Sequence, residues 1–232
     1  MSVHRTHPLW LSLAVAVACA APAVCVPGPA LAQFEPPPVV ESPPTVTVTT
    51  SPILWRRSLA LGFPWQGSLV DGVQLPAGGT DWFSWDFALR RIPNRGRRRW
   101  GTDYLLRKVL RVCHQYRDAN LDSPRCAIGD LSRPFGGDFG PQFGGMGHRS
   151  HQNGLDADIY YPRLDRLERA PRRVEQIDVE LAQDLVDRFV DAGAQFVFVG
   201  PHTGLTGPPQ IVQPLIYHDE HLHVRFPNRR RF

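Results

Sequence analysis

The sequence predicts a single α+β domain with a central, mainly antiparallel sheet flanked by helices. Two segments carry apolar residues at helical spacing, and several short apolar or alternating segments have the spacing of strands. The chain has 232 residues, which is enough for one domain with a substantial core, and no segment is repeated. Helices mixed with short strands of varied spacing are typical of the α+β class.

The N-terminal segment 1–32 has the three parts of a secretory signal peptide. A weakly basic start precedes the apolar run 9–20, and Ala30, Leu31 and Ala32 form a small-residue cleavage site before Gln33. The apolar run is short for a membrane span, although an uncleaved anchor stays an alternative. We therefore expect an exported protein, periplasmic or extracellular at the cell wall, with no stable membrane insertion after signal cleavage.

Residues 33–54 are expected to form a linker. This stretch is rich in Pro, Val, Thr and Ser and has almost no large apolar side chains. Such a composition cannot bury enough surface to offset the entropy lost on ordering, so an extended tether is expected. The globular domain is then expected over 55–232.

The domain begins with a segment punctuated by glycine and proline, 58–76, which predicts short strands joined by loops. A helix is expected next, because Thr102 is a good N-terminal cap and apolar residues follow at helical spacing as far as Tyr116. A second helix is expected over 174–192, ended by Gly193.

Short strands are expected at 127–131, 155–160, 195–199 and 221–226, and a glycine-rich loop at 134–147. In 155–160 and 221–226 polar and apolar residues alternate, which is the pattern of a strand with one face in the core. The polar residues of each strand must then share the other face.

The net charge of +4 comes from 26 basic and 22 acidic residues, with arginines concentrated at 90–99 and 229–231. Basic runs can bind nucleic acid, but an exported protein seldom meets it, so no nucleic-acid partner is expected. An anionic wall polymer is one alternative for these arginines. A solvated loop at 90–99 is the default expectation.

Two cysteines, Cys113 and Cys126, remain after the signal segment is removed. Because exported proteins fold in an oxidising compartment, we expect these two to form a disulfide. Two buried thiols are the alternative.

Two short segments hold five of the nine histidines together with two aspartates: His148, His151, Asp156, Asp158, and His218, His221, His223. A His and an Asp from one element with a His from another is the usual way to hold a catalytic zinc, with one position left for water. The remaining His114 and His202 lack such a context and are expected at the surface or in the core.

Strand geometry sorts the second segment in part. The alternation at 221–226 places His221 and His223 on one face, where both could reach one ion, or one could bind it while the other handles a proton. His218 is out of phase with that face unless the chain bends at Asp219 and Glu220, so we expect it farther from the metal.

The first segment has to turn before it can contribute two ligands. Residues seven apart lie roughly 10 Å apart on a helix, so His151 and Asp158 can share a metal only if the chain turns between them. Gly154 is well placed for that turn. Asp156 and Asp158 share a strand face, and either could be the ligand. Two histidines and a carboxylate suit Zn²⁺ best.

These motifs resemble those of the penicillin-insensitive murein endopeptidases. The run Ser-His-Gln-Asn-Gly-Leu-Asp-Ala-Asp at 150–158 and the His-Leu-His at 221–223 look like the family's signature, and the runs at 147–151 and 223–226 match this branch in particular. The family belongs to a superfamily with the lysostaphin-type enzymes, the D-alanyl-D-alanine peptidases and the hedgehog signalling domain. The resemblance covers about residues 55–227.

The resemblance implies the hedgehog/D-Ala-D-Ala peptidase fold and one Zn²⁺ per chain. It implies three metal ligands, His151, Asp158 and His223. It implies three catalytic histidines: His221 as base or electrostatic helper, with His148 and His218 as further active-site residues. Asp156 is then a candidate to orient a ligand imidazole.

The function implied by the resemblance is a zinc-dependent murein endopeptidase that hydrolyses D-alanyl–diaminopimelate cross-links, with peptidoglycan stem peptides as its partner. A D,D-carboxypeptidase or dipeptidase would use the same site and remove a terminal D-alanine. A non-catalytic, zinc-containing wall-binding module is a third alternative. The presence of His221 favours an enzyme over that module.

Overall fold

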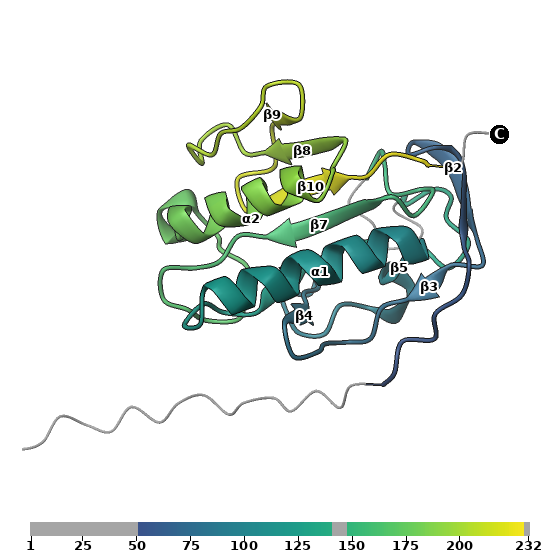
Figure 1. Cartoon of the computed structure of the whole chain (residues 1–232), viewed down its shortest axis with the longest axis horizontal. Coiled ribbons are helices and arrows are strands. Elements are labelled where there is room, and N and C mark those ends of the chain that lie inside the picture. Colours follow the sequence, from purple (N-terminus) through teal and green to yellow (C-terminus); the bar gives the residue numbers. More distant parts are fainter. Residues whose placement is uncertain (1–50, 141–147, 230–232) are drawn as a thin grey trace, which may run out of the picture. The chain divides into compact units, whose positions relative to one another are not determined.

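A computed structural model describes residues 51–140 and 148–229 of the chain (Figure 1). The predicted signal segment, most of the predicted linker and part of the glycine-rich loop lie outside the described residues, and their assignments stay predictions. Among the residues that are described, none of the helices combines the length and apolar character needed to cross a membrane.

The centre of the domain is a six-stranded sheet with the order β4-β6-β7-β10-β8-β9. Its strands are β4 (Trp82–Ser84), β6 (Cys126–Ile128), β7 (Asp156–Tyr160), β8 (Phe196–Val199), β9 (Val212–Pro214) and β10 (His221–Arg225). The pairs β6–β7, β7–β10 and β10–β8 are antiparallel, whereas the edge pairs β4–β6 and β8–β9 are parallel. The predicted α+β fold with a mainly antiparallel sheet is confirmed.

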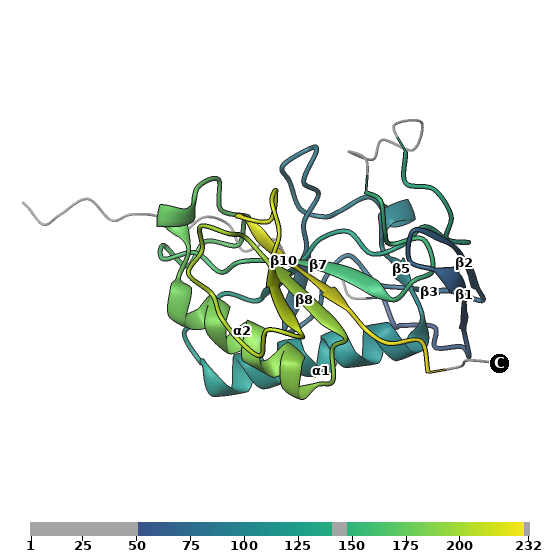
Figure 2. The same cartoon turned by 90° about the horizontal axis from the view of Figure 1, so that it is seen from above.

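Two small antiparallel sheets precede and adjoin the central one. Strands β1 (Leu59–Phe63) and β2 (Gln66–Val70) form a hairpin, and β3 (Val73–Gln74) pairs with β5 (Trp100–Gly101). The glycine- and proline-punctuated opening therefore contains short strands, as its composition predicts. In Figures 1 and 2 these strands lie together at one end of the domain.

Two α-helices complete the domain, α1 (Asp103–Ala119) and α2 (Val179–Asp191). Thr102 caps α1 as predicted, because its hydroxyl accepts a hydrogen bond from the Leu105 N–H at 3.1 Å. The predicted start of the second helix is wrong by several residues. Val174–Gln176 is a separate 3₁₀ turn, and α2 begins only after Asp178, whose carboxylate caps it through the Leu181 N–H.

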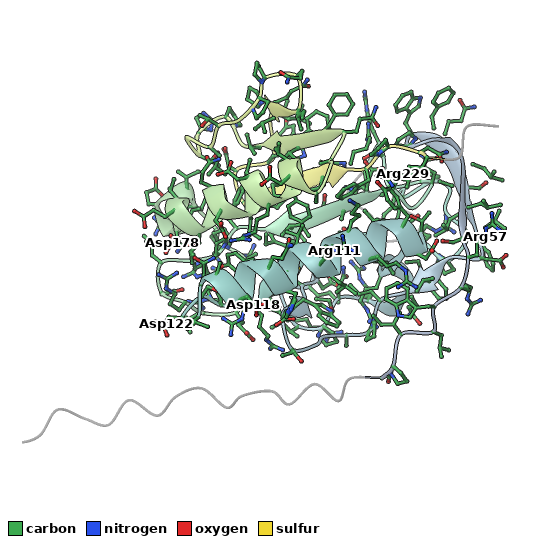
Figure 3. All side chains as sticks on the ribbon, in the orientation of Figure 1. Arg57, Arg111, Asp118, Asp122, Asp178 and Arg229 are labelled. Atoms are coloured by element: carbon green, nitrogen blue, oxygen red, sulfur yellow. The ribbon has the colours of Figure 1, made fainter. Side chains whose placement is uncertain are left out.

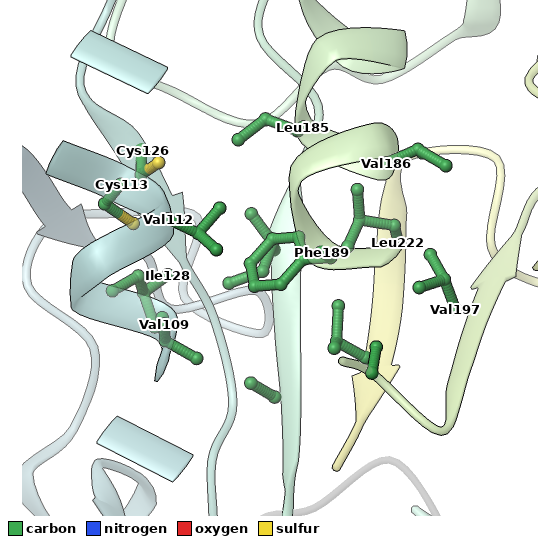
Figure 4. Packing of buried hydrophobic residues seen from close by; sticks show 14 of the residues in the cluster. Val109, Val112, Cys113, Cys126, Ile128, Leu185, Val186, Phe189, Val197 and Leu222 are labelled. Carbon is green, nitrogen blue, oxygen red and sulfur yellow. The ribbon is translucent and has the colours of Figure 1, made fainter. Parts of the chain in front are cut away.

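Both helices pack on the same face of the central sheet, as Figure 2 shows. Apolar side chains from the helices and from alternate strand positions form the main core between them, including Val112, Phe189, Ile159, Leu222 and Val224 (Figure 4 shows part of this cluster). Since Ile159, Leu222 and Val224 face the helices, the alternate positions of β7 and β10 face away from them. Those positions carry Asp156 and Asp158 on β7 and His221 and His223 on β10.

The expected disulfide is absent from the described part of the chain, so that prediction is wrong. Cys113 on α1 and Cys126 on β6 are free thiols, both buried in the main core (Figure 4). Burial in apolar surroundings raises the pKa of the Cys113 thiol well above its ordinary value. A thiol held in its neutral form is a poor nucleophile, so Cys113 behaves as a small apolar core residue.

Candidate metal centre

The two histidine-containing motifs meet because β7 and β10 are neighbours in the sheet. Their antiparallel register places His223 opposite Asp158 and Arg225 opposite Asp156. Directly opposed side chains on one face of an antiparallel pair lie roughly 5 Å apart at their Cβ atoms. Strand pairing alone therefore brings the two motifs into one site, although they are distant in sequence.

The loop that carries His151 turns as its glycine predicts. Gly154 has φ of +76°, and a Cβ there would lie 2.9 Å from a Leu69 methyl and 3.1 Å from the Thr102 nitrogen. The Gly154 carbonyl accepts hydrogen bonds from the Thr102 N–H at 2.9 Å and from its hydroxyl at 3.1 Å. The N-terminus of α1 thus fixes the turn. His151 itself has φ of +69°, a strained conformation that is concentrated at functional sites.

Three buried ligand-type atoms converge where the motifs meet. His151 Nε2 lies 3.2 Å from Asp158 Oδ1, and His223 Nδ1 lies 3.1 Å from the same oxygen. His151 Nε2 and Asp158 Oδ1 are buried without a hydrogen-bond partner among the described residues. Buried polar atoms are costly to leave unpaired, and a cation shared by these atoms would satisfy them. The donor set therefore fits a divalent metal.

Asp156 holds the His223 ring in the orientation that this arrangement needs. Its Oδ1 lies 2.7 Å from His223 Nε2 and accepts a hydrogen bond from Arg225 Nε at 2.7 Å. With Nε2 on Asp156, the other ring nitrogen faces Asp158. Burial alone would lower the pKa of His223, but its hydrogen bond with Asp156 and the nearby negative charge of Asp158 raise the pKa to about 9. The same two carboxylates that retain a proton on this ring would attract a metal cation.

His148 lies beside the same carboxylate but is already engaged. His148, His151 and Asp158 each offer one ligand-type atom within 4.8 Å of the others, so a second candidate ligand set exists. However, His148 Nε2 lies 2.8 Å from Asp130 Oδ2 and 3.9 Å from Asp158 Oδ2. His223 approaches Asp158 more closely and through an uncommitted nitrogen. His223 is therefore a candidate for the third ligand beside His148.

Asp130 is a buried site residue that the sequence reasoning missed. It accepts hydrogen bonds from Arg98 Nε at 2.6 Å and Asn94 Nδ2 at 3.0 Å, and its own carbonyl accepts the Asp158 N–H at 2.9 Å. Burial opposes its charge, yet hydrogen bonds with Arg98 and His148 lower the pKa of Asp130 below its ordinary value. The only sequence feature that pointed to a role for Asp130 was its position near the end of the predicted strand 127–131.

The expectation that 90–99 is a solvated loop is wrong for Arg98. Its side chain is only 4% exposed, because a buried carboxylate at Asp130 requires a buried positive partner. Arg95 likewise pairs with the fully buried carboxylate of Asp86, at 2.6 Å. The arginine-rich segment thus supports the site, because Arg98 holds Asp130, which in turn contacts His148.

His221 and His218 complete the histidine cluster. His221 Nε2 lies 3.8 Å from Asp158 Oδ1, and its Nδ1 is buried without a hydrogen-bond partner in the described part of the chain. Burial lowers the pKa of His221 to about 3, so its ring is neutral near pH 7. The chain bends before β10 and brings the His218 ring to 4.8 Å from that of His221, between centroids. Burial also lowers the pKa of His218.

The two remaining histidines of the domain lie outside this cluster, as predicted. The His114 side chain is 61% exposed beside Asp81 and Asp118, and that of His202 is 72% exposed beside Asp219. Both are surface residues.

Comparison with known proteins adds an independent finding. The sequence model of one protein family, the penicillin-insensitive murein endopeptidases, matches residues 60–195. The matched residues include Asp130 and the first motif, but they end before the second motif. The pairing of β7 with β10 brings that second motif into the same site. No curated protein matches the chain. Because the matched residues make up more than half of the 232, the chain belongs to the family of penicillin-insensitive murein endopeptidases.

Proposed function

We propose that this protein is a zinc-dependent murein endopeptidase that hydrolyses D-alanyl–diaminopimelate cross-links of peptidoglycan. The observation that carries the proposal is the convergence of His151 Nε2 and His223 Nδ1 on Asp158 Oδ1, in a site built by both motifs. Family membership supports murein as the substrate.

In the proposed site His151, Asp158 and His223 hold one Zn²⁺ per chain, and Asp156 orients the His223 ring. Two histidines and a carboxylate form a ligand set that catalytic zinc commonly uses. Zinc held in this way supplies Lewis acidity, which acidifies a coordinated water and polarises a scissile carbonyl.

His221 is the proposed general base. Its neutral ring offers a lone pair to the proton of an attacking water, and the negative charge of Asp158, which raises the pKa of His221 against the effect of burial, would favour that proton until it passes to the leaving amine. Its buried and unpartnered Nδ1 and its position beside Asp158 support this role.

His148 and His218 are the proposed donors to oxygen atoms of the substrate. Burial opposes the charged form of His148, but its hydrogen bond with Asp130 and the charge of Asp158 outweigh this effect and raise its pKa. A protonated imidazole fixed by Asp130 is suited to stabilise a developing oxyanion. This chemistry uses no serine nucleophile, so a β-lactam would find no group to acylate.

The substrate proposal is tested by digestion of purified muropeptides with mass analysis. Loss of cross-linked dimers with terminal D-alanine retained is the expected result. Loss of terminal D-alanine with the dimers intact would instead identify a D,D-carboxypeptidase on the same site. Binding without either reaction would identify the wall-binding module.

The proposed substrate lies outside the cytoplasmic membrane, so the protein must be exported. We propose cleavage of the signal segment after Ala32. N-terminal sequencing of the secreted protein should begin at Gln33, and a start at Met1 would contradict export by cleavage.

A further inference from the structure

The hairpin of β1 and β2 exposes two aromatic rings at its turn. Phe63 is 59% exposed and Trp65 is 56% exposed, although the same hairpin buries Ala60 and Leu69 on its inner face. The two rings lie nearly parallel, with centroids 5.2 Å apart and planes 7° apart. Large exposed aromatic surface is uncommon on soluble domains and often marks a binding site.

This turn is attached directly to the loop that carries the metal ligand His151. The carbonyl of Pro64, which lies between the two aromatic residues, accepts a hydrogen bond from the Gln152 N–H at 2.9 Å. Asn153 Nδ2 donates to the Gly62 carbonyl at 3.4 Å. The residues directly after His151 therefore fix the position of the rings relative to the metal centre.

Two glycines make this close approach possible. Gly62 has φ of +69°, and a Cβ there would lie 2.5 Å from the Gln66 carbonyl oxygen. At Gly67 a Cβ would lie 2.4 Å from the Phe63 carbonyl oxygen and 2.9 Å from the Asn153 Cβ. The two glycines thus let the backbone of the turn that carries the exposed rings pack against the ligand loop.

The ring faces suit one part of the proposed substrate in particular. Murein consists of strands of neutral, N-acetylated sugars that are cross-linked by short peptides. An aromatic face carries partial negative charge, which attracts the weakly positive C–H groups on the flat face of a pyranose ring. The stem peptides carry charged and amide groups, which find few hydrogen-bond partners on the faces of aromatic rings.

We propose that Phe63 and Trp65 form a stacking subsite for a sugar of the glycan strand, next to the peptidase centre. The subsite rests on the proposed murein endopeptidase function, and it would position a cross-link by holding the strand to which the stem peptide is attached. Preference for glycan-bearing over glycan-free cross-links would follow.

The test compares two substrates in the metal-loaded protein: cross-linked peptides with the glycan removed, and the same cross-links on intact glycan. Relative to wild type, the double variant Phe63→Ala/Trp65→Ala should lose about tenfold more kcat/KM on the glycan-bearing substrate than on the glycan-free one. Leu121→Ala is the matched control, since Leu121 is 80% exposed and directly precedes Asp122, which lies at the opposite end of the domain from β2 (Figures 1 and 3). It should behave as wild type on both substrates.

A second readout does not depend on hydrolysis. Isothermal titration with a tetramer of N-acetylglucosamine should show binding to wild type and to Leu121→Ala, and loss of binding in the double variant. If wild type cleaves neither substrate but binds the tetramer, the endopeptidase proposal fails and the sugar subsite stands.

Three outcomes overturn the subsite. Equal losses on both substrates would mean that the hairpin only supports the His151 loop. Unchanged activity on both, with tetramer binding retained, would mean that the rings contact no sugar. Binding of wild type to phospholipid vesicles but not to the tetramer, lost in the double variant, would assign the rings to a membrane surface.

Discussion

Asp156 Oδ1 lies 2.7 Å from His223 Nε2, on neighbouring strands of the central sheet. This contact leaves His223 Nδ1 facing Asp158, at 3.1 Å, and so decides which ring nitrogen is available to the proposed metal. Of the two aspartates that share the strand face, one orients an imidazole and the other lies among the candidate ligands. The first prediction follows from this division of roles.

Asp156→Asn should weaken Zn²⁺ binding about 10- to 100-fold, because an amide holds the His223 ring less firmly and raises its basicity less. Affinity is measured by competition with a chromophoric chelator. Asp122→Asn, at an exposed position, is the control and should bind zinc as wild type does. Unchanged affinity in Asp156→Asn would show that Asp156 does not orient a ligand.

Asp130→Asn should destabilise the metal-free protein by about 3 to 5 kcal/mol at pH 7, since it removes the buried carboxylate charge that is paired with the buried Arg98 guanidinium. The pKa of Asp130 in the folded protein is below its unfolded value of about 4, so the charged carboxylate stabilises the fold above that pH. That stabilisation is lost as the pH falls towards the folded pKa. The difference in the free energy of unfolding between variant and wild type should therefore be smaller at pH 3 than at pH 7.

Urea unfolding at pH 7 and pH 3 measures this difference. Asp118→Asn is the comparison, because the side chains of Asp118 and of its partner His114 are both exposed, by 68% and 61%, and the loss of this pair should cost under about 1 kcal/mol. If Asp130→Asn lowers the free energy of unfolding by the same amount at both pH values, Asp130 is not a charged, stabilising residue.

Thr102→Ala should lower the free energy of unfolding by about 1 to 2 kcal/mol, because it removes the cap of α1 and the hydroxyl bond to the Gly154 carbonyl. Thr102→Ser keeps the hydroxyl and should retain most of the stability. Denaturant unfolding of the metal-free variants distinguishes the two. If serine and alanine are equally destabilising, the hydroxyl has no part in holding the turn.

Cys113 and Cys126 should be unreactive towards a thiol reagent in the native protein and react as two thiols per chain in denaturant without reductant. Burial of both sulfur atoms is the reason. Titration of thiols in the purified exported protein makes the measurement. If the denatured protein shows no reactive thiols and its mass is two hydrogens below that of the reduced chain, the two cysteines form a disulfide.

Local patterns in the sequence predicted the strands that build the site. The alternation at 155–160 and 221–226 reflects one face in the core, and it correctly grouped His221 with His223 and Asp156 with Asp158. The turn at Gly154 was predictable because His151 and Asp158, seven residues apart, can reach one metal ion only if the chain turns between them.

Features that depend on contacts between distant segments were not predictable in this way. The pair of Arg98 and Asp130 forms only when η1 (Gly96–Arg98) packs under the end of β6, and an isolated arginine-rich run resembles a solvated loop. Strands β4 and β5 have only three and two residues, too few to show a period. The late start of α2 reflects the cap at Asp178, which competes with the apolar spacing at Val174.

The central claim is that different histidines of one catalytic centre bind the metal and transfer the proton. One paired measurement tests this claim most directly. Zinc content and hydrolysis of cross-linked muropeptide dimers are determined for wild type, His151→Ala and His221→Ala. Wild type should hold one zinc and cleave the dimers, His151→Ala should lose both properties, and His221→Ala should keep the zinc while losing at least about 100-fold in rate. Full activity in zinc-free His151→Ala, or an undiminished rate in His221→Ala, would contradict the claim.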